Sequence, residues 1–164
     1  MVPVIVCFLM DFGFFHDFCD NMIDMPERFP EEQRCRILTF PEDLLYSDTH
    51  EWVIEKGREV TIGLTDYAQS QLGDIVYVNV PEVGSEFKKG DSIGEVESVK
   101  TVADIYSPIT GKVTEVNIAL RDHPQFVNED PYRKGWLVKM EIQDREELKG
   151  LLSFGAYQGS LATD

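Results

Sequence analysis

The fold is decided by the stretch Gly94-Glu95-Val96-Glu97-Ser98-Val99-Lys100-Thr101-Val102-Ala103-Asp104-Ile105-Tyr106. Two β-rich runs flank a short polar tip, which is typical of a hairpin. Lys100 occupies the tip, so we expect its amine to point into water from a rigid base. The plain interpretation is a solvated turn lysine. The sharper one is an attachment point, because an exposed lysine on a rigid hairpin suits enzymatic acylation.

On both sides of this hairpin the chain alternates short β-rich runs with turns. The runs lie at 51–55, 60–64, 75–80, 111–116 and 136–142. Several short strands, little helix and no parallel βαβ unit predict a β-sandwich or flattened barrel.

Two short helices are expected beside these strands. Thr65 can cap a helix over 66–72, which Gly73 is placed to end. Asp144 can cap a final helix with a shared leucine face, formed by Leu148, Leu151 and Leu152. We expect 154–164 to be a flexible tail.

Composition changes sharply near residue 40. Residues 1–40 hold all 3 Cys, 7 of the 10 Phe and 4 of the 5 Met. No Lys or Arg precedes Arg28, which fits neither a signal peptide nor an Arg-rich transit peptide. We interpret 1–40 as an N-terminal extension, disordered or from a non-native start, that precedes a domain at 41–153. A docking or targeting segment and an unusual export signal are the alternatives.

The chain is strongly acidic, with 30 Asp and Glu against 15 Lys and Arg and a net charge of −15. Nucleic-acid binders need basic residues to displace phosphate counterions, and anionic membranes repel acidic surfaces. We therefore expect no nucleic-acid or membrane partner and a monomeric protein.

Nothing in the sequence is typical of an active site. Residues 41–164 contain no Cys, and their two histidines, His50 and His123, stand in no recognisable triad. HExxH, CxxC, EF-hand and phosphate-loop patterns are absent from the sequence. We expect no catalytic residue and no metal site.

Four ordered blocks now identify a resemblance. The hairpin block joins Glu97-Ser98-Val99-Lys100 to residues 105–113. The others are residues 46–52 (Tyr-Ser-Asp-Thr-His-Glu-Trp), residues 63–68 with 72–74, and residues 127–132 with 135–137. In order and spacing, residues 41–152 resemble the glycine cleavage system H protein family.

The resemblance implies a fold and a function. The fold is mainly β, a lipoyl-domain-like flattened barrel or sandwich (hammerhead) with a short N-side helix and a C-terminal helix. The protein would be a carrier and not an enzyme, with lipoate joined to Lys100 by an amide. It would take the aminomethyl group of glycine from glycine decarboxylase (P-protein) to the aminomethyltransferase (T-protein), and dihydrolipoyl dehydrogenase (L-protein) would reoxidise it.

The resemblance also assigns roles to further residues. Glu97, Ser98 and Val99 would be recognised by the lipoate ligase or lipoyl transferase. Glu51, Trp52 and Tyr67 would line a cleft into which the loaded arm folds. Alternatively, Glu51 is a solvated strand residue and the two aromatic residues belong to the core. Some relatives carry a His where this chain has Gln71, which puts a His contact with the arm in doubt.

Rival functions remain open within this resemblance. The domain could relay lipoyl groups to other complexes, or it could be a lipoyl or biotinyl domain of another complex. Biotin domains normally place Met on each side of the lysine, whereas Val99 and Thr101 stand here. A bacterial member would be cytoplasmic and a eukaryotic member mitochondrial.

Overall fold

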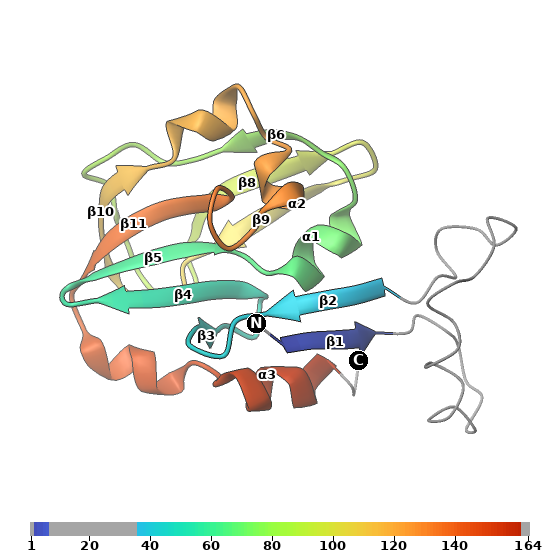
Figure 1. Cartoon of the computed structure of the whole chain (residues 1–164). Coiled ribbons are helices and arrows are strands. Elements are labelled where there is room, and N and C mark those ends of the chain that lie inside the picture. The colour runs from blue at the N-terminus through green and yellow to red at the C-terminus, as the bar shows by residue number, and fades with distance from the viewer. Residues whose placement is uncertain (1, 7–35, 162–164) are drawn as a thin grey trace, which may run out of the picture.

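Strand pairing arranges the described part of the chain into three antiparallel sheets. The computed structural model describes residues 2–6 and 36–161 (Figure 1). The largest sheet has the order β3-β4-β5-β11-β10-β7. Its strands are β3 (Leu45–Tyr46), β4 (Glu51–Lys56), β5 (Glu59–Leu64), β11 (Trp136–Ile142), β10 (Gly111–Val116) and β7 (Glu86–Phe87).

The expected hairpin forms the second sheet. Its order is β6-β8-β9, with β6 (Ile75–Asn79), β8 (Ser92–Ser98) and β9 (Val102–Tyr106). The last residue pair before the tip is Glu97 with Val102. The third sheet pairs β1 (Val2–Val6) with β2 (Arg36–Phe40).

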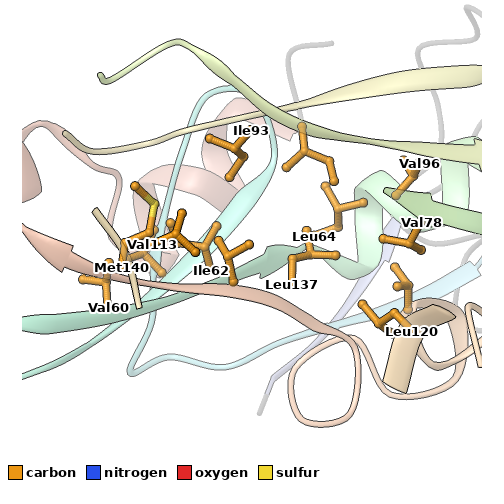
Figure 2. Close-up of a cluster of buried hydrophobic side chains, with 14 of the residues drawn as sticks. Val60, Ile62, Leu64, Val78, Ile93, Val96, Val113, Leu120, Leu137 and Met140 are labelled. Atoms are coloured by element: carbon orange, nitrogen blue, oxygen red, sulfur yellow. The ribbon is translucent and has the colours of Figure 1, made fainter. Parts of the chain in front are cut away.

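The core lies between the two larger sheets. Alternation along the strands sends one set of apolar side chains inward from each sheet. The six-stranded sheet contributes Ile62 and Met140, and the three-stranded sheet contributes Val78 and Val96, all at most 2% exposed. Figure 2 shows all four in one cluster, with Ile62 and Met140 toward one end and Val78 and Val96 toward the other. The predicted β-sandwich with its short helix is confirmed.

The short helix and its signals are as expected. α1 (Asp66–Leu72) begins after Thr65, whose side chain accepts a hydrogen bond from the amide of Ala68. It ends at Gly73, whose φ of 79° is in the left-handed region that glycine tolerates. Two further short helices, η3 (Ile118–Arg121) and α2 (Phe126–Glu129), lie in the connection between β10 and β11.

A second buried cluster contains residues from both sides of the two predicted domain boundaries. Residues Phe154–Leu161, expected in the flexible tail, form helix α3, in which Tyr157 is fully buried. Phe40, placed in the extension, packs edge-on against Tyr157 with ring centroids 5.6 Å apart. The physical reason is mutual burial of apolar side chains from β2, β3 with the residue before it, β4 and α3: Leu38, Phe40, Leu44, Tyr46, Trp52, Tyr157 and Leu161. Residues 1 and 7–35 of the predicted extension lie outside the described residues.

The helix expected after Asp144 is shorter and tighter than predicted. Asp144 does cap it, but the helix is the 3₁₀ segment η4 (Arg145–Gly150). Of the three leucines, only Leu148 lies within it. Leu152 instead exchanges two backbone hydrogen bonds with Tyr46 and so extends the β3 edge.

Gly63 allows a test of packing between β4 and β5. It lies opposite Trp52, and a Cβ added there would stand 2.6 Å from the indole ring. Gly63→Ala should therefore lower the free energy of unfolding by about 1–3 kcal/mol. Urea unfolding measures this change. Gly159→Ala is the control, because its Cβ would meet nothing within 4 Å. Equal stability of Gly63→Ala and wild type would contradict the close packing.

Candidate functional site

Ser98 fixes the tip of the β8–β9 hairpin. Its amide donates to the carbonyl oxygen of Thr101 at 2.8 Å. Its hydroxyl donates to the same carbonyl at 3.1 Å and accepts from the amides of Lys100 and Thr101 at 3.2 and 3.1 Å. Because these hydrogen bonds converge on one residue, they hold the backbone of the tip in one conformation.

Lys100 lies at the exposed end of this turn. The turn is also tied to the connection between α1 and β6, since the amide of Val99 donates to the carbonyl of Asp74 at 3.2 Å. The structure thus presents an exposed lysine on an anchored backbone, as the sequence predicted.

The three residues predicted for recognition divide into two kinds. Glu97 is exposed and Val99 is 76% exposed, so both side chains are accessible to a partner. Ser98 is only 6% exposed, and its hydroxyl is engaged within the turn. Ser98 therefore shapes the tip, and only its two neighbours present side chains to solvent.

Glu51 is a buried carboxylate that joins the two larger sheets. It is 1% exposed and accepts hydrogen bonds from the Ser47 hydroxyl, from Thr49 Oγ1 at 2.5 Å and from the amide of Tyr106 at 3.1 Å. Burial raises its pKa, and these hydrogen bonds oppose the rise. The interpretation of Glu51 as a solvated strand residue does not fit this position.

Glu51 lies far from the lysine tip along β9. That strand leads from Val102, next to the tip, to Tyr106, whose amide Glu51 binds. Four residue steps of extended strand span about 13 Å. The lysine tip and Glu51 therefore lie at opposite ends of β9.

Trp52 belongs to the second buried cluster, and Tyr67 packs against it. Trp52 is 2% exposed, and its Nε1 donates to the carbonyl of Pro131 at 3.1 Å. Tyr67 is half-buried, and its ring lies 4.7 Å from the ring of His50. Both residues pack in or against the second cluster, whereas Glu51 hydrogen bonds to β9. The three predicted cleft residues thus do not form one surface.

His50 and Tyr157 form a contact that the sequence analysis missed. The Tyr157 hydroxyl lies 2.9 Å from His50 Nδ1 and 3.0 Å from Thr65 Oγ1. His50 has a φ of 70°, a left-handed conformation unusual for a residue other than glycine. Helix α3 therefore helps to hold the 47–51 loop that supplies the hydrogen bonds around Glu51. The spacing of Phe154, Tyr157 and Leu161 was the available signal for that helix.

A pocket of about 540 Å³ opens beside this loop. Thr49 and Tyr106, which both bind Glu51, line it together with one residue of each charge, Asp48 and Lys89. No local sequence pattern predicts this pocket, because its walls come from segments far apart in the chain.

Comparisons with known proteins agree with this geometry. The family model described as "Glycine cleavage H-protein" matches residues 44–164. This chain belongs to the glycine cleavage H-protein family. It is 50% identical to the glycine cleavage system H protein of Bacillus licheniformis, over 77% of this chain and 100% of that protein. It is 53% identical to that of Staphylococcus haemolyticus, over 74% of this chain and 96% of that protein.

A solved structure of another member of the H-protein family supports the fold. The crystal structure of the glycine cleavage system H protein from Mycobacterium marinum matches with a TM-score of 0.66 and 38% identity. The match covers 75% of this chain and 99% of that one. The hairpin lysine of this H-protein family member therefore sits in the fold that the sequence predicted.

The described part of the chain lacks two features. Within residues 2–6 and 36–161, no three His, Cys, Asp or Glu side chains are grouped to hold a metal ion. In the same part of the chain, no helix is long and apolar enough to cross a bilayer.

Ser98→Ala tests the rigidity of the tip. The change removes the acceptor for the amides of Lys100 and Thr101. A hydrogen bond of about 0.5–1.5 kcal/mol is lost at each amide, so we expect hydrogen exchange there to rise about tenfold. Mass spectrometry of exchanged peptides measures the change. Ser92→Ala, at the exposed start of β8, is the control. Unchanged hydrogen exchange at the tip of Ser98→Ala would contradict the role of Ser98 in holding the turn.

Glu51→Gln tests the buried carboxyl. Because the pKa of Glu51 is raised above its ordinary 4.5, the folded state holds this proton more tightly than the unfolded chain. That contribution to stability is present below the ordinary pKa and is lost as pH rises through the raised one. The stability of Glu51→Gln relative to wild type should therefore increase from about pH 4 to pH 7.

Urea unfolding across that pH range measures the effect. Asp48→Asn, on the same loop but exposed, controls for the loss of one negative charge. A pH-independent difference between Glu51→Gln and wild type would contradict the raised pKa.

Proposed function

We propose that this chain is a lipoyl-bearing carrier of the glycine cleavage system. The observation that carries the proposal is the exposed Lys100 on a turn locked by Ser98. An amide on this lysine would hold its acyl group on a fixed anchor in solvent. Membership of the H-protein family supports the same function.

The residues present fit an amide-linked lipoyl group. An arm of this kind needs an accessible amine and a backbone that does not yield, and the hairpin supplies both. When bound, the group's dithiol supplies the redox and group-transfer chemistry. The chain itself positions the arm and raises its effective concentration at each site that it can reach.

In this proposal the partners are the other components of the system. The chain carries the aminomethyl group of glycine from glycine decarboxylase to the aminomethyltransferase, and dihydrolipoyl dehydrogenase reoxidises it. A lipoate ligase or lipoyl transferase would load Lys100 after reading the exposed Glu97 and Val99. The two relatives named above are bacterial, which supports the expectation of a bacterial cytoplasmic protein.

The far end of β9 is where we expect the loaded arm to rest. The pocket beside Thr49 and Tyr106 lies about one arm's reach along the strand from Lys100. A cationic amine at the arm's end would be attracted by Asp48 on the pocket wall. Glu51 fixes Thr49 and Tyr106, so its effect on the arm would pass through these two residues.

Intact-mass analysis tests the attachment. Protein produced with lipoate and a lipoate ligase should gain one lipoyl-sized increment. Lys100→Arg should abolish that increment, because arginine keeps the charge but has no acylatable amine. Lys112→Arg, an exposed lysine on β10, is the matched control and should be modified like wild type.

Two results would overturn the proposal. A biotin-sized increment would indicate a biotinyl domain of another complex. No increment on wild type under lipoate-replete conditions would show that Lys100 is not an attachment site.

A further inference from the structure

Large apolar side chains are exposed around the lysine hairpin. Val99 at the tip is 76% exposed, Val102 at the start of β9 is 58% exposed, and Val76 and Tyr77 on β6 are 50% and 49% exposed. We call these four residues with Glu97 the hairpin face. Apolar side chains gathered on one surface commonly mark an interaction site.

Strand register shows that much of this face is one continuous row. Tyr77 pairs with Glu97, and Glu97 pairs with Val102. Directly opposite residues in antiparallel strands share a side of the sheet, so these three side chains lie next to one another. The neighbouring residues Val78 and Val96 point the other way and are buried in the core.

A β-bulge adds the fourth apolar residue. The pairing of β6 with β8 shifts between Ile75 and Tyr77, which leaves Val76 as the extra residue. In a regular strand Val76 and Tyr77 would face opposite sides, but here both are half-exposed. The bulge thus directs Val76 toward solvent, although a valine could have packed in the core.

The charge of this surface indicates what kind of partner it fits. Glu95 and Asp104 form the next cross-strand pair on the same side, and strands β6, β8 and β9 carry no basic residue. The complement is an apolar surface with a basic rim.

We propose that the hairpin face is the docking surface for the enzyme that acylates Lys100. This inference rests on the proposed function. Attachment joins Lys100 Nζ to the carbonyl carbon of lipoyl-adenylate, with loss of a proton from the amine and release of AMP. The ligase forms the adenylate from free lipoate and ATP, with release of pyrophosphate. The ligase must bring its reaction centre to the base of the arm, so it has to cover the residues around the tip. Enzymes that act on the far end of the arm do not have to cover these residues.

Lipoylation kinetics with a bacterial lipoate ligase, lipoate and MgATP test the docking surface. Tyr77→Thr and Val102→Thr keep a strand-forming residue but remove apolar contact area. Each should lower kcat/KM for the carrier about tenfold, as expected of a central interface residue. Val83→Thr is the matched control, because Val83 is 60% exposed beyond the opposite end of β6 and should leave kcat/KM unchanged.

Thermal unfolding of all variants shows whether the fold is kept. Raising the salt concentration should lower kcat/KM for wild type, because salt screens the attraction between the acidic face and a basic partner. If the wild type is lipoylated and both hairpin variants match Val83→Thr, the docking surface is wrong and the carrier function stands. If Lys100 of the wild type gains no lipoyl group, the proposed function fails and this inference fails with it.

Discussion

Burial of the two larger sheets against each other is the constraint on which the hairpin depends. A two-stranded hairpin alone is marginally stable, and here β6 extends the β8–β9 hairpin into a sheet with one face packed against the six-stranded sheet. That seal also fixes register, because a slip of one residue would exchange the buried Val96 with the exposed Glu97. The outer face and the tip are then available for chemistry without cost to the core.

The buried carboxylate of Glu51 provides the polar counterpart of this apolar contact. Apolar packing holds the sheets together but has little directional preference. The hydrogen bond from the Tyr106 amide to Glu51 is directional, and it connects the end of β9 to the start of β4. Burial of a charge is unfavourable, which is why the pKa of Glu51 is raised and why several donors surround it. Glu51, whose ionisation is unfavourable, thus lies where the two sheets must align.

Local patterns in the sequence predicted much of this arrangement. Alternating residues identified the strands, Thr65 and Gly73 bounded α1, and the tip between two strand runs identified Lys100. What they missed depends on distant partners. Gly155 and Gly159 weaken the helical signal of α3, and that helix is secured by burial of Tyr157 against β2 and β3. Regular alternation would expose only one of Val76 and Tyr77, so it cannot predict that the bulge leaves both exposed.

The two buried clusters have a common wall in β4, where Val53 belongs to one cluster and Trp52 to the other. The sandwich that supports the hairpin therefore keeps a complete core of its own, and α3 and β2 pack together outside that core. Such a division separates the molecule into units that can open at different free energies. Opening of α3 would remove the contacts of Tyr157 with His50 and Thr65 but not the hydrogen bonds of Ser98 at the tip, so the two ends of β9 depend on different contacts.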